Sequence, residues 1–171
     1  MNKKLNKILK IFSSVLVVLA MLFAFAIAGV KLFGLQVYAV LSSSMEPEYK
    51  TGALIYVKKV DPKDLEVGDV ITFMISKETT ATHRIVDIQR DENNSDQLCF
   101  KTKGDANKIE DSGLVHQANV LGTPVFNVPY LGYIANFIKE PPGMYLSVCI
   151  GLILIIFVFM SDYLTSEKED K

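Results

Sequence analysis

The sequence predicts a mainly β fold, in which one antiparallel β domain is anchored by two transmembrane helices. Half of the 171 residues are apolar, a share that is high for one soluble domain of this length. Many of the apolar residues gather in two long uncharged runs near the ends of the sequence. Between these runs, short stretches rich in Val, Ile, Phe, Thr and Tyr alternate with turn-forming residues, which is the pattern of a β domain.

The first uncharged run covers residues 11–30. About 20 helical residues, rising roughly 1.5 Å each, match the ~30 Å hydrocarbon core of a bilayer, so this run predicts transmembrane helix 1. Four lysines precede it in residues 1–10, and the positive-inside rule places such a segment in the cytoplasm. A cleaved secretory signal peptide is the alternative, but its apolar region of about 7 to 15 residues would be shorter and would end at a small-x-small site.

The second uncharged run, residues 144–160, predicts transmembrane helix 2. Two spans return the chain to the cytoplasm, so residues 161–171 are expected as a solvated, disordered tail and residues 31–143 as the extracytoplasmic domain. Just before the second span, residues 129–140 carry aromatic and aliphatic side chains at helical spacing. This stripe suits a helix at the membrane interface, and packing on the β domain is an equally ordinary alternative.

Five strands are expected in the extracytoplasmic segment, whose length of about 110 residues is that of one domain. Each stretch is enriched in β-branched and aromatic residues and is bounded by turn formers. The loop after the third strand contains Asn93, Asn94 and Ser95, a formal glycosylation sequon. The expected strands cover residues 53–60, 69–75, 80–89, 97–103 and 119–128.

The segment "LSSSMEPEY", residues 41–49, follows soon after the first run. One structural explanation is a helix start in which Ser43 and Glu46 form a capping box, although Pro47 would then stand where its ring disturbs the helix. A second is a flexible Ser-rich linker, which the stiff proline fits poorly. A chemical explanation is a serine nucleophile, which needs an adjacent base.

The two histidines of the chain are the candidate bases. His83 lies in the strand expected over residues 80–89, and His116 lies in a loop-like stretch. A lone histidine in a strand is ordinarily structural, but the turn-rich segment after the fourth strand supplies Asp105 and Asp111. Either carboxylate could orient an imidazole. Serine, histidine and aspartate act together only if the fold brings them into contact.

The stretches "LSSSMEP", "GDVITF", "THRIV", "TKGDAN" and "VPYLG" resemble, in order and spacing, the sequence boxes of type I signal peptidases. The resemblance covers almost the whole chain, and the ordered set is specific where no single box is. It is nearest to the ER-type branch of eukaryotes, archaea and some Gram-positive bacteria. The common bacterial branch has a lysine-arginine pair where this chain has His83 and Arg84. One departure is Ser43, where the family usually has glycine, and this side chain could narrow the approach to the cleft.

The resemblance implies a role for each candidate residue. Ser44 is implied to be the nucleophile and His83 its general base, a task that suits an imidazole with an unperturbed pKa of about 6.5. The backbone N–H of Ser44 and the hydroxyl of Ser42 are the implied oxyanion donors. Asp111 is expected to orient His83 while Asp105 braces the loop, although the reverse assignment stays open. No metal and no cofactor are required.

The resemblance also implies the substrates and the location. The chain would be a membrane-bound serine endopeptidase that removes signal peptides from secretory preproteins with small-x-small sites, on the outer or lumenal side of the bilayer. The preproteins that are cut and any need for accessory subunits are left open. The alternatives are a non-catalytic membrane-anchored β module, an inactive relative, or a lipid esterase, whose G-x-S-x-G motif is missing. A net charge of −1 and the lack of a basic cluster in the extracytoplasmic segment argue against nucleic acid as a partner.

Overall fold

The structure is a computed structural model, and it describes residues 3–91 and 96–166. It divides into two compact units. One unit holds Phe33–Asn136, and the other holds the two terminal segments with helices α1 (Lys3–Leu32) and α3 (Gly143–Ser166). The predicted sequon at residues 93–95 lies outside the described residues.

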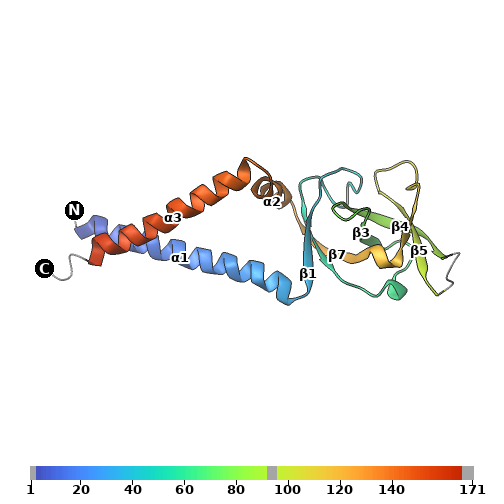
Figure 1. Cartoon of the computed structure of the whole chain (residues 1–171), viewed down its shortest axis with the longest axis horizontal. Helices are drawn as coiled ribbons and strands as arrows, with labels where there is room; N and C mark the ends of the chain where they lie inside the picture. The colour runs from blue at the N-terminus through green and yellow to red at the C-terminus, as the bar shows by residue number, and fades with distance from the viewer. Residues whose placement is uncertain (1–2, 92–95, 167–171) are drawn as a thin grey trace. The chain divides into compact units, whose positions relative to one another are not determined.

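The first unit is a β domain (Figure 1). Within the described residues, seven strands form one sheet in the order β1-β2-β7-β3-β4-β5-β6. Every neighbouring pair is antiparallel, which confirms the mainly β, antiparallel fold class. The strands are β1 (Leu35–Ala39), β2 (Leu54–Lys58), β3 (Val70–Met74), β4 (Thr80–Arg90), β5 (Leu98–Lys103), β6 (Leu114–His116) and β7 (Val120–Val128).

The five expected strands are present as β2, β3, β4, β5 and β7, with ends that differ by at most two residues. The two edge strands were missed. β1 pairs with β2, and β6 pairs with β5 through the register Cys99↔His116, so the prediction that His116 lies in a loop is wrong. In the described part of the chain, each of these strands pairs with one neighbour, so its conformation depends on that pairing more than on its own sequence.

Two buried clusters form the core of the β domain. The first cluster centres on Phe100 and Ile71, and the second centres on Met45 and Val57. Ile71 belongs to the first cluster while its neighbour Val70 packs against the second. Because adjacent strand residues point to opposite faces, the clusters lie on opposite sides of β3.

The stripe over residues 129–140 forms helix α2 (Leu131–Lys139), as its spacing predicts. The start of α2 packs on the β domain: the Gly132 N–H donates to the Gly52 carbonyl oxygen at 2.9 Å. A Cβ added to Gly132 would lie 2.3 Å from the Ala53 carbonyl oxygen, so glycine permits this approach. Tyr133 and Ile134 nevertheless remain exposed. The stripe therefore combines a packed start with an exposed apolar face.

In the second unit, α1 and α3 come together near the two ends of the chain (Figure 1). There the rings of Phe12 and Phe157 meet edge-on, with centroids 5.8 Å apart. Among the described residues, one stretch, Gly143–Met160 of α3, is long and apolar enough to cross a membrane. Among the described residues of α1, the apolar stretch is Lys10–Leu22, and the uncharged run of the sequence continues beyond it to residue 30. Length and composition thus support the second predicted span, and the first stays a prediction.

Helix α3 also continues to Ser166, beyond residue 160, where the sequence predicts a disordered tail. For residues 161–166 that prediction is wrong, since the helix extends past the end of the uncharged run. Residues 167–171 lie outside the described part of the chain.

Candidate active site

Ser44 lies in the turn that links β1 to β2. The next side chain, Met45, is 2% exposed and belongs to the second core cluster, so it anchors the turn. On the other side, the Ala106 N–H donates to the Ser44 carbonyl oxygen at 2.9 Å. Ser44 is therefore held both by the core and by the loop after β5.

The same turn excludes the helix-start explanation. Residues 44–48 form turns, and Glu46 Oε1 accepts from the backbone N–H of Thr51 at 3.3 Å and from its hydroxyl at 3.2 Å. Glu46 thus binds forward along the chain, where a capping box would have it reach back to Ser43. Ser43 is exposed and is not among the residues that line the cleft described below, so the expected narrowing of that cleft is not found.

His83 comes from β4, where it pairs with Ile71 of β3. Its Nε2 atom lies 3.1 Å from the Ser44 hydroxyl oxygen. The imidazole meets the ring of Phe73 edge-on, with centroids 6.2 Å apart, and its side chain is only 14% exposed. The ring is thus fixed on the sheet with one nitrogen directed at the serine.

Asp111 completes this arrangement from the loop after β5. Its Oδ2 atom lies 2.6 Å from His83 Nδ1, and its side chain is 28% exposed. An ionised carboxylate only accepts hydrogen bonds, so Nδ1 carries the proton and Nε2 is left as the acceptor for the Ser44 hydroxyl. The structure therefore brings together Ser44, His83 and Asp111 in the arrangement of a serine triad, with the hydroxyl at one ring nitrogen and the carboxylate at the other.

Asp105 faces a different partner. The Arg84 guanidinium binds it through two hydrogen bonds, Nε to Oδ1 at 2.8 Å and Nη2 to Oδ2 at 2.7 Å. Arg84 Nη1 also donates to the Gly68 carbonyl oxygen at 2.8 Å. The side-chain hydrogen bonds to Asp105 raise the pKa of Arg84 further above its usual range. Asp105 is thus tied to a permanently charged group, and not to the imidazole.

Residues of the loop after β5 that sequence reasoning left out support the serine. A Cβ added to Gly104 would lie 2.6 Å from the Ser44 carbonyl oxygen and 2.8 Å from the Asn107 side-chain nitrogen. Glycine at this position therefore lets the loop approach the serine turn. The box "TKGDAN" contained both residues, but the sequence alone did not show that this loop packs against Ser44.

Thr102 is another residue of the site that the sequence analysis does not predict. It is 0% exposed in β5, and its hydroxyl donates to Asp111 Oδ2 at 2.7 Å. The sequence does carry a signal for it, since Thr102 occupies the same strand face as the buried Phe100. A polar side chain on a buried face needs a partner, and here the partner is Asp111.

Ser42 lies next to the triad. Its hydroxyl oxygen is 3.1 Å from that of Ser44. A second hydroxyl at this distance can donate to an oxygen that develops negative charge near Ser44.

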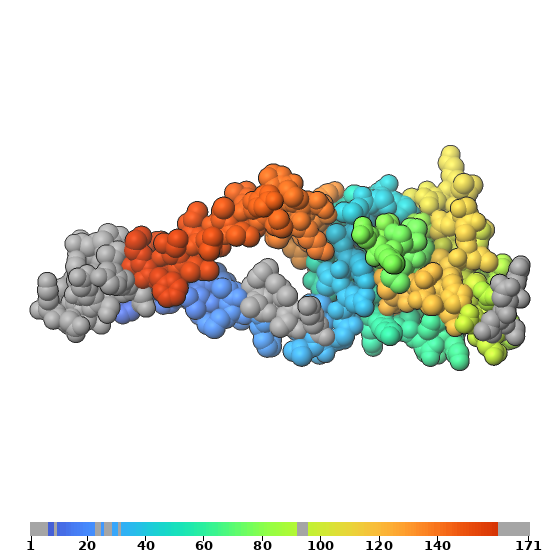
Figure 2. Space-filling model, in the orientation of Figure 1, coloured from blue at the N-terminus to red at the C-terminus, as the bar shows by residue number. Residues whose placement is uncertain are grey.

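A cleft of about 670 Å³ opens beside Ser44 and His83. One wall is the segment from Tyr38 to Ser42, and the other includes Ile75 and the first residues of β4. Figure 2 shows these two segments next to each other on the surface of the β domain. The cleft extends away from the triad, so it can hold a chain of several residues.

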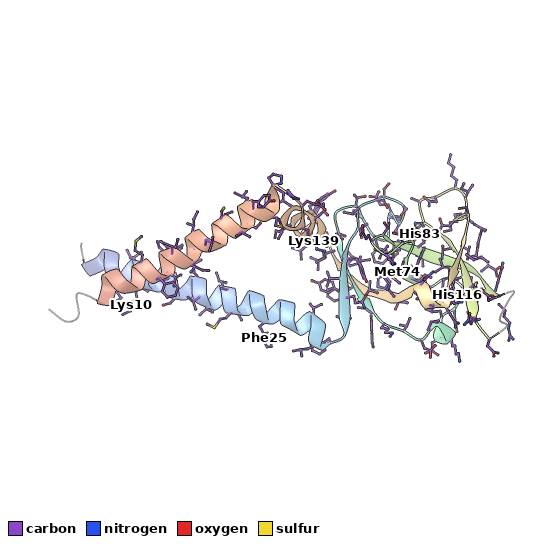
Figure 3. The ribbon with its side chains drawn as sticks, in the orientation of Figure 1. Lys10, Phe25, Met74, His83, His116 and Lys139 are labelled. Atoms are coloured by element: carbon purple, nitrogen blue, oxygen red, sulfur yellow. The ribbon has the colours of Figure 1, made fainter. Side chains whose placement is uncertain are left out.

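His116 does not take part in this site. Its Nε2 lies 2.8 Å from Gln97 Oε1, and its Nδ1 accepts from the Ala118 N–H at 3.2 Å. Figure 3 shows His83 and His116 well apart in the β domain. His116 is therefore a structural histidine, which caps the short 3₁₀ helix Gln117–Asn119.

Comparisons with known proteins are consistent with this geometry. A family model described as signal peptidase, peptidase S26, matches residues 10–98, which include Ser44 and His83. Signal peptidase I W of Bacillus subtilis is 54% identical over 89 residues. That alignment covers 52% of this chain and 45% of the Bacillus protein, so the chain spans less than half the length of this relative.

Two eukaryotic relatives align over a longer part of the chain. The signal peptidase complex catalytic subunit SEC11 of Scheffersomyces stipitis is 30% identical over 131 residues, which cover 69% of this chain and 76% of that protein. The protein of the same name from Plasmodium falciparum is 35% identical over 129 residues, with 70% and 68% covered.

Proposed function

Because the chain belongs to the signal peptidase family, peptidase S26, we propose that it is a serine endopeptidase that removes amino-terminal signal peptides from secretory preproteins. The observation that carries the proposal is the continuous path of hydrogen bonds from Ser44 through His83 to Asp111. A non-catalytic β module or an inactive relative has no need of such a path.

In the proposed first half-reaction, Ser44 Oγ attacks the carbonyl carbon of the scissile peptide bond while His83 Nε2 takes its proton. Asp111 holds the opposite ring nitrogen and stabilises the imidazolium that forms. The Ser44 N–H and the Ser42 hydroxyl are the proposed donors to the oxyanion, and losing one such donor typically lowers the rate about 100- to 1000-fold.

The tetrahedral intermediate then collapses and the C–N bond breaks. The leaving amine of the mature protein takes the proton from His83, and the signal peptide stays on Ser44 as an ester. Water attacks this ester with His83 again acting as the base, which releases the signal peptide and restores the serine hydroxyl. Each step uses one proton transfer through the same imidazole.

The cleft suits an extended peptide. The pairing of β4 with β5 begins at Arg84↔Lys103, so residues 80–83 pair only with β3 in the described part of the chain. Their other edge faces the cleft and offers free backbone groups to a substrate strand. Side chains of the substrate would alternate along this strand, which fits a small-x-small site that must place every second residue against the cleft wall.

The membrane part of the proposal places both α1 and α3 across the bilayer, with the β domain outside or in the lumen. The exposed apolar face of α2, which directly precedes α3, would then lie at the interface. Protease added outside intact cells should cut the β domain and spare both ends, and cleavage of either end contradicts two spans.

Accessory subunits enter the proposal through the SEC11 relatives, whose name makes them subunits of a complex.

The proposal is tested with the purified chain in detergent and a preprotein that carries a small-x-small site. We expect one cleavage, at that site, identified by the mass of the new amino terminus. His83→Ala should remove the activity, whereas His116→Ala, the matched control, should change it little. No cleavage by the folded parent chain, or equal cleavage by His83→Ala, would sink the proposal.

A further inference from the structure

Two threonines are fully buried in the strands on either side of β4, and their hydroxyls bind different partners. Thr72 of β3 and Thr102 of β5 are both 0% exposed. The Thr72 hydroxyl lies 2.8 Å from the hydroxyl of Thr82. The Thr102 hydroxyl instead donates to a carboxylate that also binds the imidazole of His83.

Thr102 holds Asp111 at two points. Its hydroxyl donates to Asp111 Oδ2 at 2.7 Å, and its carbonyl oxygen accepts from the Asp111 N–H at 2.9 Å. The second bond fixes the backbone of Asp111 whatever side chain residue 102 carries. The first depends on the hydroxyl alone, so the two contributions can be separated by substitution.

The same oxygen of Asp111 binds both partners. His83 Nδ1 lies 2.6 Å from Oδ2, and the Thr102 hydroxyl lies 2.7 Å from it. Because both donors are fixed, the Asp111 carboxylate cannot rotate without breaking at least one of these two hydrogen bonds. Because Ile85, two residues after His83 on the same strand, pairs with Thr102, the donor is built into the sheet that carries the imidazole.

We propose that the Thr102 hydroxyl is a positioning group that fixes the Asp111 carboxylate on His83 Nδ1, so that Nε2 stays free to take the proton of Ser44. This inference rests on the proposed function and adds a residue to its machinery. Thr102 acts through Asp111 and touches neither the substrate nor the serine.

The test compares Thr102→Val, Thr102→Ser and the control Thr72→Val in preprotein cleavage. Hydrogen bonds to charged groups are strong enough that losing this one should lower kcat roughly 10- to 100-fold. KM should stay near the parent value, because the cleft is untouched. Thr102→Ser keeps the donor and should recover most of the rate. Thr72→Val should keep a near-parental kcat for each folded molecule.

A spectroscopic measurement makes the inference independent of turnover. The ¹⁵N chemical shifts of the His83 ring, assigned with His83→Ala, report which nitrogen carries the proton. In the parent chain and in Thr72→Val, we expect Nδ1 to be protonated. In Thr102→Val, the Nδ1 signal should move toward that of a mixture of the two tautomers, and Thr102→Ser should restore it.

The two ideas fail in different ways. If the parent chain cleaves the preprotein but Thr102→Val matches Thr72→Val in both kcat and ring shifts, the role of Thr102 is refuted and the peptidase stands. If the parent chain cleaves no preprotein, the proposed function fails. In that case unchanged His83 shifts in Thr102→Val also refute the positioning role, and changed shifts support it.

Discussion

The loop after β5 carries Asp105 near its start and Asp111 near its end, and these two carboxylates bind basic side chains of different kinds. Asp105 binds the Arg84 guanidinium through two hydrogen bonds. Asp111, six residues later, binds the imidazole of His83. A guanidinium stays protonated in proteins, so Asp105 can only brace the loop. An imidazole gains and loses a proton near neutral pH, so Asp111 can influence a proton transfer.

This difference shows that the partner decides what a carboxylate does. Both acids hold the same short loop. The Asp105 end also carries Ala106, whose N–H donates to the Ser44 carbonyl oxygen, and Gly104, where a Cβ would collide with that oxygen. The Asp105 end thus supports the position of the serine turn, and the Asp111 end supports the orientation of the base.

The largest effect that separates the two ends is expected for Asp111→Asn. The amide can donate to the imidazole, which favours the wrong tautomer and leaves the imidazolium without its negative charge. The analogous change in the worked serine-protease triad lowers kcat about 10⁴-fold. We expect a loss of similar size here with near-normal abundance in the membrane, measured as cleavage rate per folded molecule.

A smaller effect, of another kind, is expected for Asp105→Asn. This change removes one charge of the ion pair with Arg84 and should lower the free energy of unfolding by roughly 1 to 2 kcal/mol. Thermal unfolding should show it at least as clearly as specific activity does. The double variant must be measured beside the single ones, because residues of one loop can couple. A folded but inactive Asp105→Asn beside an active Asp111→Asn would reverse the assignment.

Much of the fold could be predicted from the sequence because the strands inside the sheet carry their own signal. β3, β4 and β5 combine β-branched and aromatic residues with turn formers at both ends. β1 and β6 could not be predicted, since these edge strands depend on the neighbour with which they pair.

The candidate site was predicted by residue type and family resemblance, and its contacts came from the fold. Nothing in the spacing of Asp105 and Asp111 tells which one reaches His83, because a loop of this length can turn either acid toward the sheet. The role of Thr102 depends on a contact between β5 and the end of the same loop. Such contacts follow from tertiary packing, which a single sequence does not specify.

The central claim is that Ser44 is the nucleophile and that the Ser42 hydroxyl donates to the oxyanion, although the two hydroxyl oxygens lie only 3.1 Å apart. The most direct measurement is the initial rate of preprotein cleavage by Ser44→Ala beside Ser42→Ala, with equal amounts of folded protein. The account predicts no product from Ser44→Ala above the uncatalysed level. For Ser42→Ala it predicts the same cleavage site with a rate about 100- to 1000-fold below the parent. An active Ser44→Ala beside an inactive Ser42→Ala would contradict it.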